Sequence, residues 1–117
     1  MTECDVGDLV LVPFPFLNLK TKKRRPALIL SVIQPKELPR FSVIAMVTSQ
    51  IRGESFPGDY LIQDWKEANL LHSSKARLAK IVSVENHLFL KKIGRLSPRD
   101  LKGCHEAFGE VFPQLLA

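Results

Sequence analysis

The sequence predicts an α+β protein that is mainly β, namely a small barrel of five or six short strands with one helix near the C-terminus. The chain has 117 residues, of which 45% are hydrophobic, and this suits one domain spanning residues 1–117 with a single core. Short β-rich runs alternate with turns rich in glycine and proline, whereas the clearest helical periodicity follows residue 97. No internal repeat or low-complexity segment divides the chain.

The predicted strands are short apolar runs bounded by turn residues, at residues 9–14, 27–33, 41–47, 60–62, 76–84 and 89–93. The first run is apolar on both faces, as expected for a strand buried in a closed barrel. Pro13 and Pro15 end it, because proline cannot donate to a strand ladder. Pro26 stands at the start of the second strand, where proline is tolerated. Residues 17–24 between these two strands are expected to form a polar, basic loop.

Two helices are predicted, one long and one short. Ser97 provides an N-cap, Pro98 suits the first helical turn and Asp100 places an acid at the third position, so a helix is expected over residues 98–112. Its apolar stripe, expected to pack on the sheet, consists of Leu101, Cys104, Phe108 and Val111. A short helix is expected after Asp64, with Glu67 as the reciprocal capping partner.

Composition argues against several classes of protein. The N-terminus lacks a signal peptide and no run approaches the roughly 20 apolar residues of a membrane span, so a cytoplasmic protein is expected. Cys4 and Cys104 form no metal-type spacing, and Cys104 is interpreted as a core residue. Common catalytic and cofactor-binding signatures are absent, so neither a metal nor a cofactor is expected.

Positive charge is concentrated in one segment. The net charge is +5 with a pI near 9.5, and five of the six residues from Lys20 to Arg25 are basic. Such a run is often only a solvated loop, but it also creates a field that attracts a phosphate backbone. Arg25 differs from its neighbours because Pro26 holds it at the junction of loop and strand, where a rigid scaffold commonly presents a functional side chain.

Other candidate residues lie at strand ends and in turns. Thr48 and Ser49 end the third predicted strand, where ordinary turn chemistry explains them as well. Arg77 and Lys80 lie on a later strand, in a pattern that also fits a solvent-facing surface. Phe56, in a loop containing glycine and proline, is a candidate for stacking on a nucleic-acid base.

An ordered set of motifs resembles the MazF/PemK toxin family over roughly residues 6 to 112. The opening motif Val6-Gly7-Asp8-Leu9-Val10 is followed by the central signature, which runs from Lys23 to Ser31 and contains Arg25-Pro26. The later matching segments are Val47-Thr48-Ser49-Gln50, residues 64–70, residues 74–78 and residues 93–97. Each motif is weak by itself, and their order along the chain makes the resemblance specific.

The resemblance implies an SH3-like barrel of the CcdB/PemK type with a C-terminal helix, acting as a cytoplasmic homodimer. It implies the toxin of a type II toxin–antitoxin pair, a metal-independent, sequence-selective endoribonuclease that cleaves single-stranded RNA and is inhibited by a cognate antitoxin protein. The catalytic residues implied are Arg25, Thr48 and Arg77. The residues expected to contact RNA are Lys20, Lys22, Lys23, Arg24, Ser49, Gln50, Phe56 and Lys80. Some members carry an acid at the position of Ala79, and this departure weakens the case for a carboxylate base there.

Metal-free RNA cleavage uses the 2′-hydroxyl of the substrate as nucleophile. Arg25 suits stabilisation of the charged phosphorane, because a guanidinium is a poor base, and Thr48 suits positioning by hydrogen bonding. None of the histidines (His72, His87 and His105) lies in a matching motif, so no acid–base role is assigned to them. The alternative is a non-catalytic barrel that binds RNA, DNA or a protein, since related gyrase-poisoning toxins share the fold and cut nothing.

Overall fold

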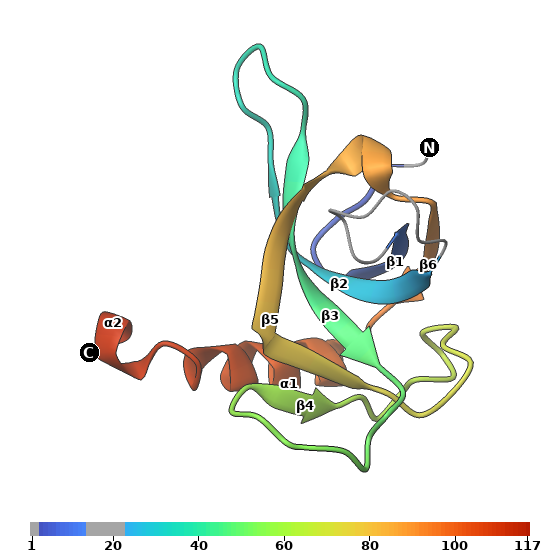
Figure 1. Ribbon diagram of the computed structural model, residues 1–117, viewed down its shortest axis with the longest axis vertical. Helices are drawn as coiled ribbons and strands as arrows, with labels where there is room; N and C mark the ends of the chain where they lie inside the picture. The colour runs from blue at the N-terminus through green and yellow to red at the C-terminus, as the bar shows by residue number, and fades with distance from the viewer. Residues whose placement is uncertain (1–2, 14–22) are drawn as a thin grey trace.

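Six antiparallel strands form one sheet with the spatial order β4-β5-β3-β2-β1-β6 (Figure 1). The computed structural model describes residues 3–13 and 23–117. The strands are β1 (Asp8–Pro13), β2 (Arg24–Ile33), β3 (Phe41–Thr48), β4 (Asp59–Leu61), β5 (Lys75–Glu85) and β6 (Lys91–Arg95). Each predicted strand is present with shifted ends, and the turn between β5 and β6 contains a 3-10 helix, η1 (Asn86–Leu88).

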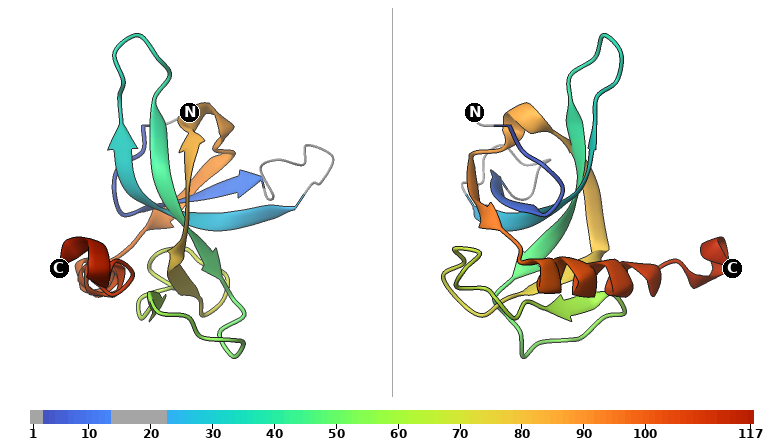
Figure 2. Two further views of the ribbon diagram at one scale, coloured as in Figure 1. Left: turned by 60° about the vertical axis from the view of Figure 1, so that its left-hand side comes forward. Right: turned by 180° about the vertical axis from the view of Figure 1, so that it is seen from behind.

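The sheet is strongly curved (Figure 2), with β1 and β6 toward one edge and β5 and β4 toward the other. The edge strands β4 and β6 are not paired with one another in the part of the chain that the structure describes. The predicted mainly β, barrel-like fold with a C-terminal helix is therefore confirmed, with the difference that the sheet remains open.

Both faces of the central strands are buried, as expected from the apolar run in β1. One face belongs to a cluster that includes Val10, Ile29 and Ile44, inside the curl of the sheet. The opposite face contributes Leu9 and Leu28 to a second cluster, which is covered by α1 (Pro98–Gly109). Successive residues of a strand point to opposite faces. Because both faces of these strands are covered, apolar residues are needed at successive positions along them, and the sequence shows a continuous apolar run in β1.

A buried carboxylate attaches β6 to β1. Asp8 is 1% exposed, and it accepts a hydrogen bond from Arg95 at 2.9 Å and lies 3.3 Å from Lys92 Nζ. Burial alone would raise the pKa of Asp8, but its bonds to the Asp5 amide and to these cations outweigh burial and lower the pKa. The ion pairs hold β6 in the register that brings Lys91 opposite Leu11.

The main helix begins as predicted but ends earlier. Ser97 Oγ accepts a hydrogen bond from the Asp100 amide at 3.2 Å and Pro98 occupies the first turn, while α1 ends at Gly109 instead of residue 112. Glycine is a weak helix former, and a residue that precedes proline is disfavoured in the helical region. Pro113 then opens the short helix α2 (Pro113–Leu116).

The predicted short helix after Asp64 is wrong, because residues 65–69 form a single turn. The Leu70 amide donates to the Trp65 carbonyl and the Asn69 amide to the Lys66 carbonyl, with Asn69 at a φ of 65°. This pattern is a Schellman motif, which ends a helix immediately. Asp64 is not its cap, since its carboxylate accepts from Ser97 Oγ at 2.6 Å and from Arg99 instead.

Asp100 connects α1 to β4 and to the turn that follows it. Its carboxylate is fully buried and accepts hydrogen bonds from Tyr60 Oη at 2.6 Å, the Gln63 amide at 2.9 Å and the Asp64 amide at 2.8 Å. Burial, followed by this hydrogen bond, raises the pKa of Tyr60. Gly103 allows the contact, because a Cβ at that position would collide with the Tyr60 ring. Asp100 thus orients the segment that leads into residues 63–74.

Candidate functional site

Arg25 lies on a projecting part of the sheet, at the start of β2. Arg24, Arg25 and Pro26 pair with Pro13, Val12 and Leu11 of β1, whereas the ladder to β3 begins only at Ala27. Pro26 has no N–H group to donate. Because it lies outside the β3 ladder, the missing donor breaks no hydrogen bond to that strand. The structure corrects two expectations, since Pro26 is the third residue of its strand and Arg24 belongs to the strand rather than to the preceding loop.

Thr48 is the last residue of β3, at the same rim of the sheet as Arg25. The pairing of Ala27 with Met46 continues, if extended by two residues, to Arg25 opposite Thr48. Thr48 Oγ1 accepts a hydrogen bond from the Gln50 amide at 3.1 Å, which fixes the side chain at the strand end. A hydroxyl group that accepts a bond in this way still has its own proton to donate.

Arg25 and Thr48 together line a cavity of about 380 Å³, which we call the rim cleft. Its lining is contributed by β1, β2, β3, β6 and the segment between β4 and β5. The polar side chains of the lining are those of Arg24, Arg25, Thr48, Ser49, Asn69, His72, Ser74 and Lys91. Three of these are cationic, and no carboxylate is among the residues that the structure places around the cleft. The rim cleft therefore suits an anionic ligand.

A second cavity of about 290 Å³ adjoins the first, and we call it the β5 cleft. Arg25, Val47 and Thr48 are common to both cavities. Its remaining lining residues are Met46, Gln50, Arg77 and Lys80. The two clefts thus form a continuous basic surface around Arg25 and Thr48, and this surface brings together residues from sequence segments more than 50 positions apart.

Arg77 reaches this surface because β5 is irregular. Ala45 pairs with Ile81 but the next residue, Met46, pairs with Arg77, so residues 78–80 are left out of the ladder. Figure 1 shows the sharp bend of β5 that results. Bulges of this kind re-aim side chains. The bend places Arg77 opposite Met46 and leaves Lys80 exposed beside the same cleft.

Arg77 is held in a buried ion pair. Its Nε and Nη2 donate to the Asp59 carboxylate at 3.2 Å each, and Nη2 also donates to the Glu54 carbonyl at 2.9 Å. Lys75 Nζ lies 3.3 Å from the same carboxylate. Burial would raise the pKa of Asp59, but hydrogen bonds from Arg77, the Phe56 amide and Lys75 overcome it and lower the pKa. These bonds use Nε and Nη2 and not Nη1, the remaining nitrogen of the guanidinium.

Phe56 is covered by cations rather than presented openly. The Arg77 guanidinium lies 4.3 Å from the ring centroid and Lys80 Nζ lies 5.2 Å from it, and the residue is half-buried. Such cation–π contacts are favourable. Stacking of Phe56 on a base, as predicted from the sequence, would compete with these contacts.

The remaining predicted residues divide between the site and the segment that is not described. Lys20 and Lys22 lie outside the described residues. Lys23 and Arg24 are exposed. Ser49 lines the rim cleft and Gln50 lines the β5 cleft.

Four polar residues of the rim cleft were not among the predicted site residues, namely Asn69, His72, Ser74 and Lys91. They come from the segment between β4 and β5 and from β6. Asn69 and Ser74 lie in segments that resemble the family, but nothing in those segments assigned them a role, and His72 and Lys91 lie in no motif. The Asn69 amide group donates to the Ile93 carbonyl at 3.2 Å, which attaches the segment between β4 and β5 to β6. The basic run of the sequence offers cations but no group that readily accepts a proton. The need for such a group is the signal that could have drawn attention to the histidines, His72 among them.

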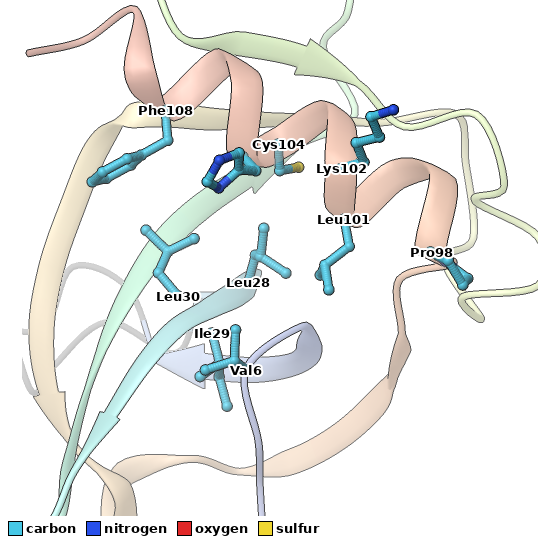
Figure 3. A pocket seen from close by; sticks show the side chains of 10 residues that line it. Val6, Leu28, Ile29, Leu30, Pro98, Leu101, Lys102, Cys104 and Phe108 are labelled. Carbon is cyan, nitrogen blue, oxygen red and sulfur yellow. The ribbon is translucent and has the colours of Figure 1, made fainter.

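A third cavity, of about 620 Å³, lies elsewhere, between α1 and β2 (Figure 3). Its lining is largely apolar and includes Leu28, Leu30, Leu101 and Phe108. Cys104 is buried here as predicted for a core residue, and burial followed by the Asp100 charge raises its pKa to about 12. Such a thiol is a poor nucleophile. This cavity contains none of the predicted site residues.

Neither a metal site nor a membrane-spanning helix is found in residues 3–13 and 23–117. No group of three or more His, Cys, Asp or Glu side chains in these ranges is arranged to hold a metal ion. No helix within them is long and apolar enough to cross a membrane.

Comparison with known proteins gives a consistent result. A family model described as the PemK-like, MazF-like toxin of type II toxin–antitoxin systems matches residues 5–112. No curated protein matches the chain.

The fold is similar to that of solved toxin structures. An endoribonuclease from a mycobacterial species is 12% identical with a TM-score of 0.70, over 97% of this chain and 94% of that one. MazF in a MazE–MazF complex from Deinococcus radiodurans is 19% identical with a TM-score of 0.64, over 91% of each chain. The Mycobacterium tuberculosis toxin MazF-mt6 is 15% identical with a TM-score of 0.64, over 91% of this chain and 96% of that one. At such identities the likeness concerns the fold alone.

Proposed function

Because the chain belongs to the PemK-like, MazF-like toxins of type II toxin–antitoxin systems, we propose that it is a metal-independent, sequence-selective endoribonuclease that cleaves single-stranded RNA. The observation that carries the proposal is the presence of Arg25 and Thr48 together in both clefts of the sheet rim. A guanidinium and a hydroxyl group that are held close together can both donate hydrogen bonds to the oxygens of a reacting phosphate.

Each of the predicted catalytic residues has a role in this proposal. Arg25 stabilises the negative charge that develops on the phosphorane, since a guanidinium forms paired bonds with phosphate oxygens. Thr48 donates its hydroxyl proton to a phosphate oxygen. Arg77 contributes Nη1 from the β5 cleft while Asp59 holds its other nitrogens.

The RNA backbone follows the basic surface around these three residues. Arg24, Lys80 and Lys91 contact phosphates, and Ser49 and Gln50 hydrogen-bond to the strand near the cut. Lys20, Lys22 and Lys23 precede β2 and steer RNA toward the rim through long-range attraction. Sequence selectivity then arises from the shape and polar groups of the two clefts.

The proposed biological setting is a cytoplasmic toxin, one domain that acts as a homodimer and is inhibited by a cognate antitoxin protein. The antitoxin is supported by family membership and by the MazE–MazF complex from Deinococcus radiodurans among the similar structures. A basic surface of this kind suits an acidic antitoxin segment that competes with RNA.

The test is cleavage of a long single-stranded RNA in EDTA by the full chain, by Arg25→Ala and by Arg40→Ala as a matched control. Arg40 lies in the connection between β2 and β3, directly before β3, and pairs with Glu3 at 3.1 Å. We expect discrete cuts with the wild type and Arg40→Ala and none with Arg25→Ala. An RNA carrying a 2′-deoxy sugar at the cut position should resist cleavage.

One observation favours a second function, that of a non-catalytic barrel binding nucleic acid or a protein. No carboxylate lines either cleft among the described residues, so a binding surface without a carboxylate base also fits. The same assay separates the two functions. Tight RNA binding with no cut at any protein concentration would establish the second and exclude the first.

A further inference from the structure

The proposed cleavage requires a group that accepts a proton. The 2′-oxygen attacks the adjacent phosphorus and loses its proton, the bond from phosphorus to the 5′-oxygen breaks, and the 5′-oxygen gains a proton. The products are a 2′,3′-cyclic phosphate and a 5′-hydroxyl, with no net change in protons. Arginines and lysines stabilise the charges that develop but remain protonated near neutral pH, so they are poor acceptors.

Asp59, the acid that contacts Arg77, is committed to other bonds. Asp59 is 6% exposed in its side chain and accepts hydrogen bonds from Arg77 and the Phe56 amide besides its ion pair with Lys75. Its lowered pKa makes it a weaker base still. Within the described lining of the rim cleft, the polar groups besides cations are hydroxyls, an amide and one imidazole.

That imidazole belongs to His72, whose backbone the structure holds in a defined position. The His72 carbonyl accepts a hydrogen bond from Ser74 Oγ at 2.8 Å, and the Ser74 carbonyl accepts one from the Ile62 amide at 2.9 Å. The buried Leu70 anchors the other side of this short segment. His72 itself is exposed to solvent while lining the same cleft as Arg25 and Thr48.

Building on the endoribonuclease function proposed above, we propose that His72 is the general base that removes the 2′-hydroxyl proton in the rim cleft. Arg25 and Thr48 hold the phosphate while the neutral imidazole accepts the proton. The imidazolium then releases it to solvent, and the 5′-oxygen takes a proton from water, to which the exposed site is open. His72 thereby supplies the one function that the arginines and Lys91 cannot.

The charged groups that line the cleft with His72 are Arg24 and Arg25 from β2 and Lys91 from β6. A neutral imidazole can accept a proton and an imidazolium cannot, so cleavage by the wild type should slow as the solution is made more acidic.

The experiment measures single-turnover cleavage of a defined single-stranded RNA by the full chain and by His72→Ala. His105→Ala is the matched control, since His105 is also exposed but lies on α1 beside the apolar cavity. We expect His72→Ala to slow cleavage by about 100-fold or more, to lose the decline at low pH and to regain rate when imidazole is added. His105→Ala should behave as the wild type, and affinity for a 2′-deoxy RNA should be equal in all three proteins.

The outcomes separate this inference from the function on which it rests. If the wild type cuts RNA and His72→Ala cuts equally fast with the same pH profile, the general base is another group and the inference is overturned alone. If cleavage falls but neither the pH profile nor added imidazole distinguishes the variant, His72 has only a structural role and the inference is again overturned. A wild type that cuts no RNA overturns both the proposed function and the inference.

Discussion

Arg25 and Arg77 show how differently two guanidinium groups can be used at one surface. Arg77 is tied to Asp59 and the Glu54 carbonyl through Nε and Nη2, while its flat face lies on Phe56. Arg25 instead stands where β2 extends past β3 and lines both clefts. Residue type alone does not distinguish these arginines, since the difference lies in where each one stands in the sheet.

The role of Thr48 is testable with two substitutions of similar size. Thr48→Val removes the hydroxyl and should slow RNA cleavage by about 100-fold, the cost typical of losing one donor to a developing oxyanion. Thr48→Ser retains the donor and should lose much less. Single-turnover rates measure the effect, and a valine variant that cuts like the wild type would contradict the assigned role.

The Asp59 ion pair predicts how stability depends on pH. The pKa of Asp59 is lower in the folded protein than in the unfolded chain, so its contribution to stability is complete above about pH 4 and is lost as the pH falls further. Asp59→Asn should reduce the free energy of unfolding at neutral pH by on the order of 3 kcal/mol, since it leaves buried cations without their partner. Urea unfolding at several pH values measures this, and the wild-type advantage should shrink in acid. An advantage that stays constant down to about pH 2, below the ordinary range of a carboxyl group, would contradict the assignment.

Among the elements, α1 organises the molecule through a polar contact as much as through its apolar stripe. Its N-terminal Asp100 binds Tyr60 of β4 and the two amides that follow the strand. These bonds set the path of the chain through Asp64 toward the segment that carries Asn69 and His72. A residue in the first turn of a helix thus has a structural effect well beyond its own helix.

Removing this carboxylate should be more costly than removing the cap beside it. Asp100→Ala leaves three donors without their acceptor and should lower the free energy of unfolding by about 3 kcal/mol or more. Ser97→Ala, which removes the N-cap, should cost about 1 kcal/mol. Urea midpoints with unchanged m values provide the comparison, with Tyr60→Phe as a control for removal of one hydrogen bond. Equal effects of the Asp100 and Ser97 variants would show that the connection to β4 is unimportant.

At the scale of the whole molecule, the curl of the sheet gathers positive charge along one rim. The net charge of +5 is modest, but Arg24, Arg25 and Lys91 meet at one cleft, and Arg77 and Lys80 line the next. Local concentration of cations matters more for binding a polyanion than their total. The rim is consequently the surface on which RNA binding should depend on salt.

The double variant Arg24→Ala/Lys91→Ala tests that dependence. Each phosphate that the protein no longer neutralises should reduce the slope of log affinity against log salt by about 0.7 for a single strand, so the slope of the double variant should be smaller by about 1.4. Lys36→Ala, in the turn that follows β2, is the control and should leave the slope unchanged. Binding is measured with a 2′-deoxy RNA, and an unchanged slope in the double variant would exclude the rim cleft as the phosphate path.

The sequence predicted those features that depend on neighbouring residues. The strands of the sheet, the Ser97 cap and the burial of Cys104 followed from local patterns, and the ordered motifs indicated Arg25 and Thr48. The prediction of a helix after Asp64 failed because its polar residues have other roles. Asp64 binds Ser97 and Arg99, and Asn69 adopts the left-handed conformation that ends the turn.

Amino-acid sequence by itself determined the mainly β class, the start of the final helix and the family to which the chain belongs, because periodicity, capping and motif order are read along the chain. Only the tertiary structure decided which side chains share a cleft. Register shifts in β5 bring Arg77 to the rim, and the turn at residues 65–69 brings in His72. Such proximity depends on how distant strands align and curl, and no local stretch of sequence encodes that arrangement.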